Sequence, residues 1–142
     1  MATTYALEVS PQYATPPGKS PGTVQGGRLR RWRATIIMAA QASGDDIVLA
    51  NIPAGHTFAF GVLNPGAAMG GTATVAIGVA GATGKYRTAA IANAVGPVIF
   101  GNAAGAAADP LGTAGEQVLL TIAAAALPGA GTVVVDLYYS AP

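Results

Sequence analysis

The densest cluster of polar side chains in this sequence lies in one short stretch, Arg28-Leu29-Arg30-Arg31-Trp32-Arg33. Four guanidinium groups around an indole have three plausible uses. They can bind carboxylates on a protein partner, because the arginine fork matches a carboxylate with two hydrogen bonds. They can hold phosphates while the indole stacks on a base. They can also guard the edge strand of a β-sheet against unwanted pairing.

The distribution of charge along the chain favours the first use. Residues 1–33 hold five basic residues and one acidic residue, a net charge of +4, whereas residues 34–142 hold two basic and five acidic residues, a net charge of −3. Nucleic-acid binders usually spread basic charge over a whole domain, so nucleic acid is the least favoured partner. The edge-strand interpretation stays open. The predicted partner-binding residues are Arg28, Arg30, Arg31, Trp32 and Arg33.

The sequence offers little else that could catalyse a reaction. His56 is the only histidine and follows the turn residues Pro53-Ala54-Gly55. A general base needs a nucleophile or substrate within hydrogen-bond reach, and a zinc site needs three or four ligands. None of the serines lies in a GxSxG motif. We therefore expect His56 to lie in a solvated turn or a subunit contact, and we predict no catalytic residue, metal site or cofactor.

Two further motifs resemble functional sites only in part. Asp45 and Asp46 precede a predicted strand, where successive side chains point to opposite faces, so turn chemistry is favoured over an acid–base pair or a calcium site. The stretch from Gly78 to Lys85 evokes a phosphate-binding loop, but Tyr86 follows the lysine in place of Ser or Thr. A strand, and not a helix, is predicted to follow. We predict a β-hairpin there.

The composition points to a folded protein that buries much of its surface against others. Hydrophobic residues make up 51% of the chain and charged residues only 9%, against about 25% charged residues in a typical soluble domain. No cysteine is present, so no disulfide or thiolate chemistry is available. The N-terminal residues lack the features of a secretory signal, and no run of 18 apolar residues exists. We expect a soluble protein with no membrane partner.

The chain divides at the arginine cluster. Residues 1–27 hold four of the ten prolines and show little apolar periodicity. Proline fixes φ and removes a backbone donor, so we expect an extended N-terminal arm with neither a helix nor a central strand. Ordering such a segment costs about 1–2 kcal/mol per residue, so the arm must lie on a large partner surface or stay mobile. Residues 28–142 are predicted to form one β-sandwich domain.

Beyond the arm, short β-prone runs alternate with turn residues, a pattern typical of a sandwich or barrel. The run Val133–Tyr139 is apolar on both faces, as in a strand covered on both sides. Residues 116–127 have good helix propensity but alternate at Val118, Leu120 and Ile122, which favours a strand. The predicted fold is all-β, an antiparallel, jelly-roll-like β-sandwich. The predicted strands are Arg31–Ala40, Asp46–Ile52, Thr57–Leu63, Thr72–Val79, Lys85–Ala92, Val98–Phe100, Gln117–Ala123 and Thr132–Ser140.

Several of these strands carry short motifs with a counterpart in a known family. The motifs are RATI at 33–36, GDDIVLANIPAG at 44–55, TVAIG at 74–78, Lys85-Tyr86 and TVVVDLYY at 132–139. They resemble a family of small virion proteins of tailed bacteriophages that decorate, or cement, the head. The similarity spans residues 28–142 and leaves the arm without a counterpart. The resemblance implies a β-sandwich, a homotrimer, and a place on the outer capsid surface at junctions between major capsid subunits; it supplies no catalytic residue.

Together these observations favour a structural virion protein over an enzyme. We expect it to decorate and stabilise a bacteriophage capsid by binding major capsid subunits and its own copies. Two alternatives stay open: a tail or neck component of the same kind of virion, and a glycan-binding module built on the same sandwich.

Overall fold

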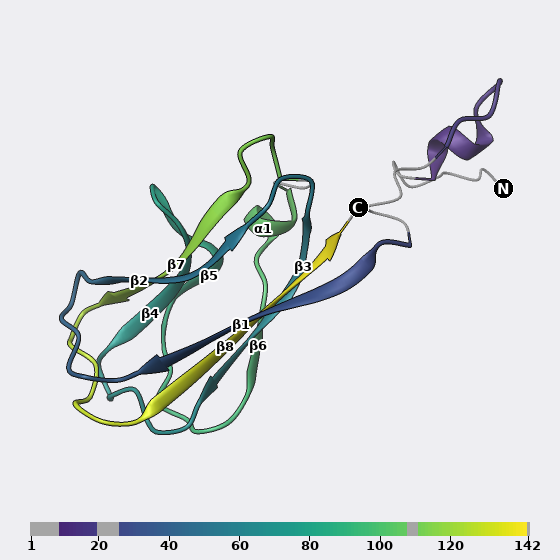
Figure 1. Ribbon diagram of the computed structural model, residues 1–142. Coiled ribbons are helices and arrows are strands. Elements are labelled where there is room, and N and C mark those ends of the chain that lie inside the picture. Colours follow the sequence, from purple (N-terminus) through teal and green to yellow (C-terminus); the bar gives the residue numbers. More distant parts are fainter. Residues whose placement is uncertain (1–8, 20–25, 108–110, 142) are drawn as a thin grey trace, which may run out of the picture.

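Eight strands in two four-stranded antiparallel sheets contain about half of the residues that the structure describes (Figure 1). The computed structural model describes residues 9–19, 26–107 and 111–141. One sheet has the strand order β1-β8-β3-β6 and the other β2-β7-β4-β5. The strands are β1 (Arg28–Ile37), β2 (Asp46–Ile52), β3 (Thr57–Pro65), β4 (Thr74–Val79), β5 (Ala82–Ile91), β6 (Val98–Phe100), β7 (Glu116–Ala123) and β8 (Thr132–Ala141).

The strands pair in the nested manner of a jelly roll. β1 pairs with β8, β2 with β7, β3 with β6 and β4 with β5, in each case antiparallel. This pattern results when one long hairpin, with β4 and β5 at its tip, is rolled up so that alternate pairs lie in opposite sheets. The predicted antiparallel β-sandwich of jelly-roll type is therefore confirmed.

The core lies between the two sheets and follows the two-residue period of the strands. On β8, the side chains of Val133, Val135 and Tyr139 are fully buried. Val134 and Tyr138 point to the outer face and are half-buried, so β8 is covered completely on one face only. The expectation that β8 is covered on both sides is therefore wrong for its outer face, where neighbouring side chains of the same sheet give partial cover.

All eight predicted strands exist; β2 and β6 have the predicted bounds, and the ends of the others differ by at most three residues. β5 begins at Ala82, because the turn between β4 and β5 consists only of Ala80 and Gly81. Gly81 has φ of +81°, the left-handed conformation that a type II turn requires at its second central residue. The alanine-rich segment after Glu116 starts as strand β7, as predicted. One short helix, α1 (Ala103–Ala107), was not predicted.

The arm contains one element that its prolines did not lead us to expect. Residues Ser10–Tyr13 form a 3₁₀ helix, η1, with Pro11 in its first turn, where the missing amide donor costs nothing. The expectation that residues 1–27 hold no helix is therefore wrong at this one turn. The backbone amide of Gly18 donates to the Pro11 carbonyl at 2.7 Å. Figure 1 shows η1 lying apart from both sheets.

Candidate partner-binding surface

The arginine cluster lies on β1, which is an edge strand. β1 pairs with β8 over ten consecutive residues, from Arg28 opposite Ala141 to Ile37 opposite Thr132. The strand order places it at the end of its sheet. Because side chains alternate along a strand, the cluster is divided between the two faces of the sheet.

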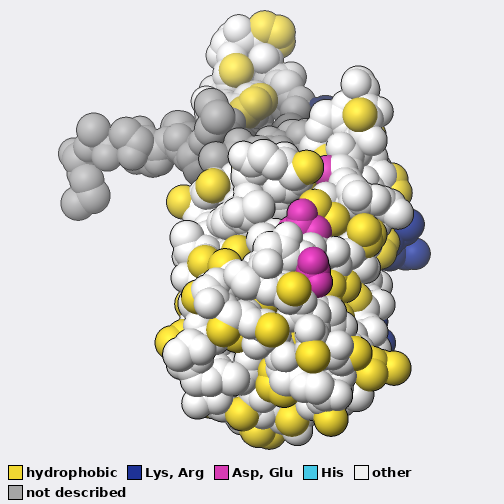
Figure 2. Space-filling view, turned by 90° about the vertical axis from the view of Figure 1, so that its left-hand side faces the viewer, with side chains coloured by type: hydrophobic (Ala, Val, Ile, Leu, Met, Phe, Trp, Pro, Cys, Tyr) yellow, Lys and Arg dark blue, Asp and Glu magenta, His cyan; other side chains and the backbone are white. Residues whose placement is uncertain are grey.

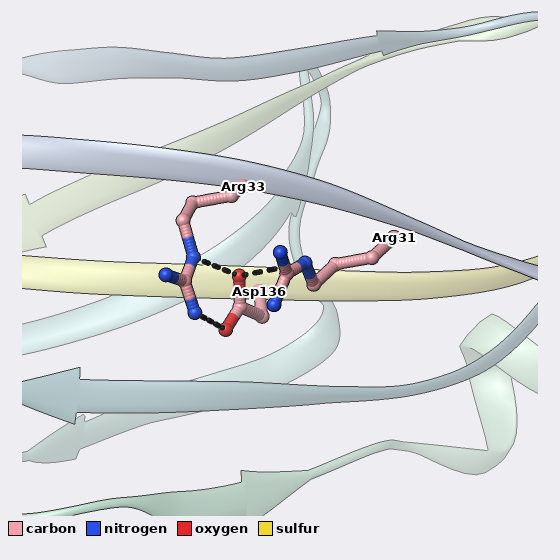
Figure 3. A network of polar contacts seen from close by, with 3 residues as sticks. All are labelled: Arg31, Arg33 and Asp136. Carbon is pink, nitrogen blue, oxygen red and sulfur yellow. Dashed lines mark hydrogen bonds and ion pairs between the residues drawn. The ribbon is translucent and has the colours of Figure 1, made fainter.

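Arg31 and Arg33 point to the outer face, where both approach Asp136 of β8 (Figure 3). Arg33 lies directly opposite Asp136 in the strand register. Its Nε donates to Oδ1 at 2.8 Å and its Nη2 donates to Oδ2 at 2.7 Å, a two-pronged carboxylate contact. The Nε of Arg31 lies 4.0 Å from Oδ1 on the other side of the carboxylate.

The environment of Asp136 explains why this carboxylate needs a cation. Its side chain is only 11% exposed, whereas those of the two arginines are 51% exposed. The hydrogen bonds from Arg33 lower the pKa of Asp136 most, the positive charges of Arg33 and Arg31 lower it further, and burial opposes them. The same hydrogen bonds raise the pKa of Arg33. Two of the four arginines are thus engaged by a carboxylate of the protein itself.

Arg28 and Arg30 point to the other side of β1, away from Asp136. Their side chains are exposed, opposite Ala141 and Tyr139 respectively in the register with β8. Within residues 9–19, 26–107 and 111–141, neither forms an ion pair. These two guanidinium groups are therefore available to a partner.

Trp32 lies on the same side as Arg28 and Arg30 but packs into the sandwich. Its ring meets that of His56 edge to face, with centroids 5.3 Å apart, and that of Tyr139 at 5.6 Å. Trp32 is half-buried and packs against the hydrophobic core. The structure therefore divides the five predicted residues between the two sides of β1. Arg31 and Arg33, the outer arginine pair, bind Asp136 on the outer face. Arg28 and Arg30 lie on the opposite side together with Trp32, which anchors the strand in the core.

His56 is buried, contrary to expectation. Its relative exposure is only 6%. The Nδ1 atom lies 3.1 Å from the Pro53 carbonyl and 3.2 Å from that of Ala54, so it carries the proton and donates to them. The solvated-turn interpretation is wrong because the turn folds over the edge of Trp32. In the described part of the chain, Nε2 has no hydrogen-bond partner.

The two remaining motifs have structural roles, as predicted. The Asp45 carboxylate accepts a hydrogen bond from the amide of Ala42 at 2.8 Å and closes the turn before β2. Asp46 accepts from the Thr121 hydroxyl of β7 at 2.5 Å. The Gly78–Lys85 stretch forms the β4–β5 hairpin. No group of three or more potential metal ligands exists among the described residues.

A buried ion pair escaped the sequence analysis. Lys85 Nζ lies 2.5 Å from Glu116 Oε2, and both side chains are only 11% exposed. The hydroxyl of Tyr139, from the opposite sheet, donates to Glu116 Oε1 at 3.4 Å. These three groups satisfy one another and tie the sheets together. No local pattern reveals such a pair, because its members are 31 residues apart.

The outer face of the β1 sheet is otherwise largely apolar. Phe60 and Tyr138 stack on this face with ring centroids 4.5 Å apart, and Ile99 on β6 is 73% exposed. Another side of the molecule, in Figure 2, shows hydrophobic side chains scattered among backbone and uncharged polar side chains. Acidic side chains gather near its middle and basic ones project at one edge. Among the described residues, no helix is long and apolar enough to cross a membrane.

This jelly roll has counterparts among solved structures. No protein-family model matches the chain, and no curated protein does. Two phage capsids contain the same fold. A chain of the cyanophage Pam1 capsid asymmetric unit superposes with a TM-score of 0.66 at 21% identity, covering 87% of this chain and 91% of that one. A chain of the capsid of Ralstonia phage GP4 gives 0.60 at 22% identity, with coverages of 82% and 86%.

Proposed function

We propose that this protein is a structural component of a tailed-bacteriophage virion that decorates and stabilises the capsid. The observation that carries the proposal is the fold shared with chains of two phage capsids over most of their length. Because this chain covers 91% of the Pam1 chain, the matched capsid component is itself built almost entirely of this sandwich. In this proposal the protein binds major capsid subunits and its own copies as a homotrimer on the outer capsid surface.

The surface of the protein supports a role in permanent assembly. Large hydrophobic side chains are exposed at several places, among them Ile37 at 71%, Val95 at 67% and Ile99 at 73%. Charged residues make up only 9% of the chain. Interfaces that stay assembled are more apolar than transient ones and are depleted of charge at their centres. A particle that carries many copies adds their individual contacts by multivalency.

In this proposal Arg28, Arg30, Arg31 and Arg33 contact the capsid, whereas Trp32 packs against the core and takes no part in the contact. Arg28 and Arg30 have no anionic partner among the described residues, which supports contact with an acidic surface. The arm precedes them in the sequence, and in this proposal it reaches a separate site on a neighbouring subunit.

Imaging of purified particles that contain the protein tests this proposal. We expect its density on the outer shell, between major capsid subunits and in groups of three, with a matching trimer mass for the isolated protein. Density confined to the tail or neck would assign the protein to those parts and overturn the decoration role. A monomeric mass, together with no binding to purified capsids, would overturn the proposal as a whole.

One observation favours the glycan-binding alternative. The stacked Phe60 and Tyr138 rings lie on the outer face beside Arg31, which is opposite Tyr138 in the register with β8. Aromatic faces next to polar groups suit sugars. A glycan-array screen with the wild-type protein and a Tyr138→Ala variant tests it: specific sugar recognition lost in the variant would support this function, and no recognition would reject it.

A further inference from the structure

Three of the four sheet edges in this protein are blunted, and one is not. β6 at one edge is only three residues long. β2 and β5, at the edges of the other sheet, pair with interrupted register, at Val48/Ala50 and at Val75/Ile77 and Ile77/Val79. Short strands and bulges are the usual protection of an edge against pairing with another chain. β1 has neither, because it pairs with β8 over ten residues without any shift.

The free side of β1 therefore presents a regular row of backbone donors and acceptors. In an antiparallel pair, every second residue directs its N–H and C=O away from its partner. A segment that adds to this side would gain backbone hydrogen bonds with little demand on its sequence. Side-chain charge then restricts which segment can do so.

That charge has a single sign. Arg31 and Arg33 are engaged with Asp136, but Arg28 and Arg30 have no ion-pair partner within the described residues. Opposite charges across neighbouring strands stabilise the pairing and like charges destabilise it. The same arginines that repel a basic strand thus attract an acidic one, so their charge selects an acidic partner.

We propose that the free edge of β1 is a strand-addition site for an extended acidic segment of a different protein. Arg28 and Arg30 are two positions apart on the same side of the strand, so they select carboxylates at alternate positions. This chain cannot supply such a segment to its own copies. Its six acidic residues are Glu8, Asp45, Asp46, Asp109, Glu116 and Asp136, and no two of them are two positions apart. The occupant is therefore foreign.

The inference rests on the proposed function only for the identity of the partner, which would be a capsid subunit. The chemistry of the site does not depend on it.

A direct test uses the full chain and three synthetic ten-residue peptides. One alternates glutamate and valine, the second has lysine for glutamate, and the third is the acidic peptide with every amide N-methylated, which keeps the charges and removes the backbone donors.

Hydrogen–deuterium exchange with and without each peptide reads out strand addition directly. We expect the alternating acidic peptide to slow exchange at every second amide of β1 and to leave the β4–β5 hairpin unchanged. The lysine and N-methylated peptides should give no protection. Equal binding of the acidic and N-methylated peptides would show charge attraction without strand pairing and would overturn the proposal, as would protection elsewhere or none at all.

Arginine variants test whether Arg28 and Arg30 favour the acidic peptide. Arg28→Ala and Arg30→Ala should each weaken binding of the acidic peptide by up to about fivefold, the range of one cross-strand charge pair. Lys19→Ala removes the same charge from the arm and serves as the matched control, with unchanged affinity. Equal loss in all three variants would overturn the role of these arginines. Peptide binding without capsid binding would reject the proposed function alone, whereas capsid binding without protection of β1 would reject this inference alone.

Discussion

Replacing Asp136 with asparagine tests whether the outer arginine pair is held by the protein itself. The substitution keeps the size and hydrogen-bonding oxygen of the side chain and removes its charge. Arg31 and Arg33 then face each other without the carboxylate that lies 2.7 Å from Arg33 Nη2 and 4.0 Å from Arg31 Nε. We expect the variant to fold and to be less stable at neutral pH.

The size of this stability loss follows from the solvent exposure of Asp136 and of its two arginine partners. A fully buried ion pair that loses one member costs about 3–5 kcal/mol, and an exposed pair contributes about 0–1 kcal/mol. Asp136 is 11% exposed but both arginines are 51% exposed, so solvent screens the interaction strongly. We expect Asp136→Asn to lower the free energy of unfolding by about 1–2 kcal/mol at pH 7.

The pH dependence distinguishes charge from packing. The folded-state pKa of Asp136 is lowered, first by the hydrogen bonds from Arg33. Its contribution to stability is therefore complete above the unfolded-state pKa of about 3.9 and is lost as the pH falls through the lower, folded-state pKa. The difference between the wild type and Asp136→Asn should shrink toward zero across this acidic range.

Urea unfolding of both proteins at pH 7 and at several values below pH 4 measures this difference. Arg33→Ala should also destabilise the protein, and its effect should not add to that of Asp136→Asn. Arg28→Ala, on the same strand but without an ion-pair partner in the described chain, is the matched control and should leave stability unchanged. A loss of stability in Asp136→Asn that is the same at pH 7 and below pH 3 would refute the electrostatic explanation.

Three further predictions concern the core and the hairpin. Glu116→Leu leaves Lys85 buried without its anion and should lower the free energy of unfolding in urea by about 3–5 kcal/mol. Adding Lys85→Met should restore much of this loss, and no recovery in the double variant would contradict the prediction. Trp32→Ala should lower the free energy of unfolding by about 2 kcal/mol, because the ring is half-buried. The folded variant should bind capsids with unchanged affinity, and a selective loss of affinity would make Trp32 a contact residue. Gly81→Val should lower the melting temperature, because a branched side chain is strained at φ of +81°, whereas Gly71→Val, in equally open space, should not.

The sequence predicted the strands well, because alternation and turn residues are local signals. It also contained the division of the arginine cluster, since residues two apart on a strand share a face. It could not give the partner of Arg33, which depends on the register between β1 and a strand 103 residues further along the chain. The Lys85–Glu116 pair was missed for the same reason.

The burial of His56 was missed for a different reason. A turn built of proline, alanine and glycine is normally exposed, and only the contact of His56 with Trp32 on β1 shows that this turn folds inward. The short helix Ala103–Ala107 was missed as well: Asn102 is a good N-cap residue, but five small residues with a central glycine have no amphipathic period. Long-range packing, and not propensity, determines both.

The nested pairing also dictates an order of assembly during synthesis. β1 is the first strand to leave the ribosome and β8 the last, yet each is the other's neighbour over ten residues. The β4–β5 hairpin, closed by two residues, can form early, whereas the outermost pair must wait for nearly the whole chain. Throughout that wait β1 is exposed along both of its sides, and its arginines are then the feature that keeps nascent chains from pairing with one another.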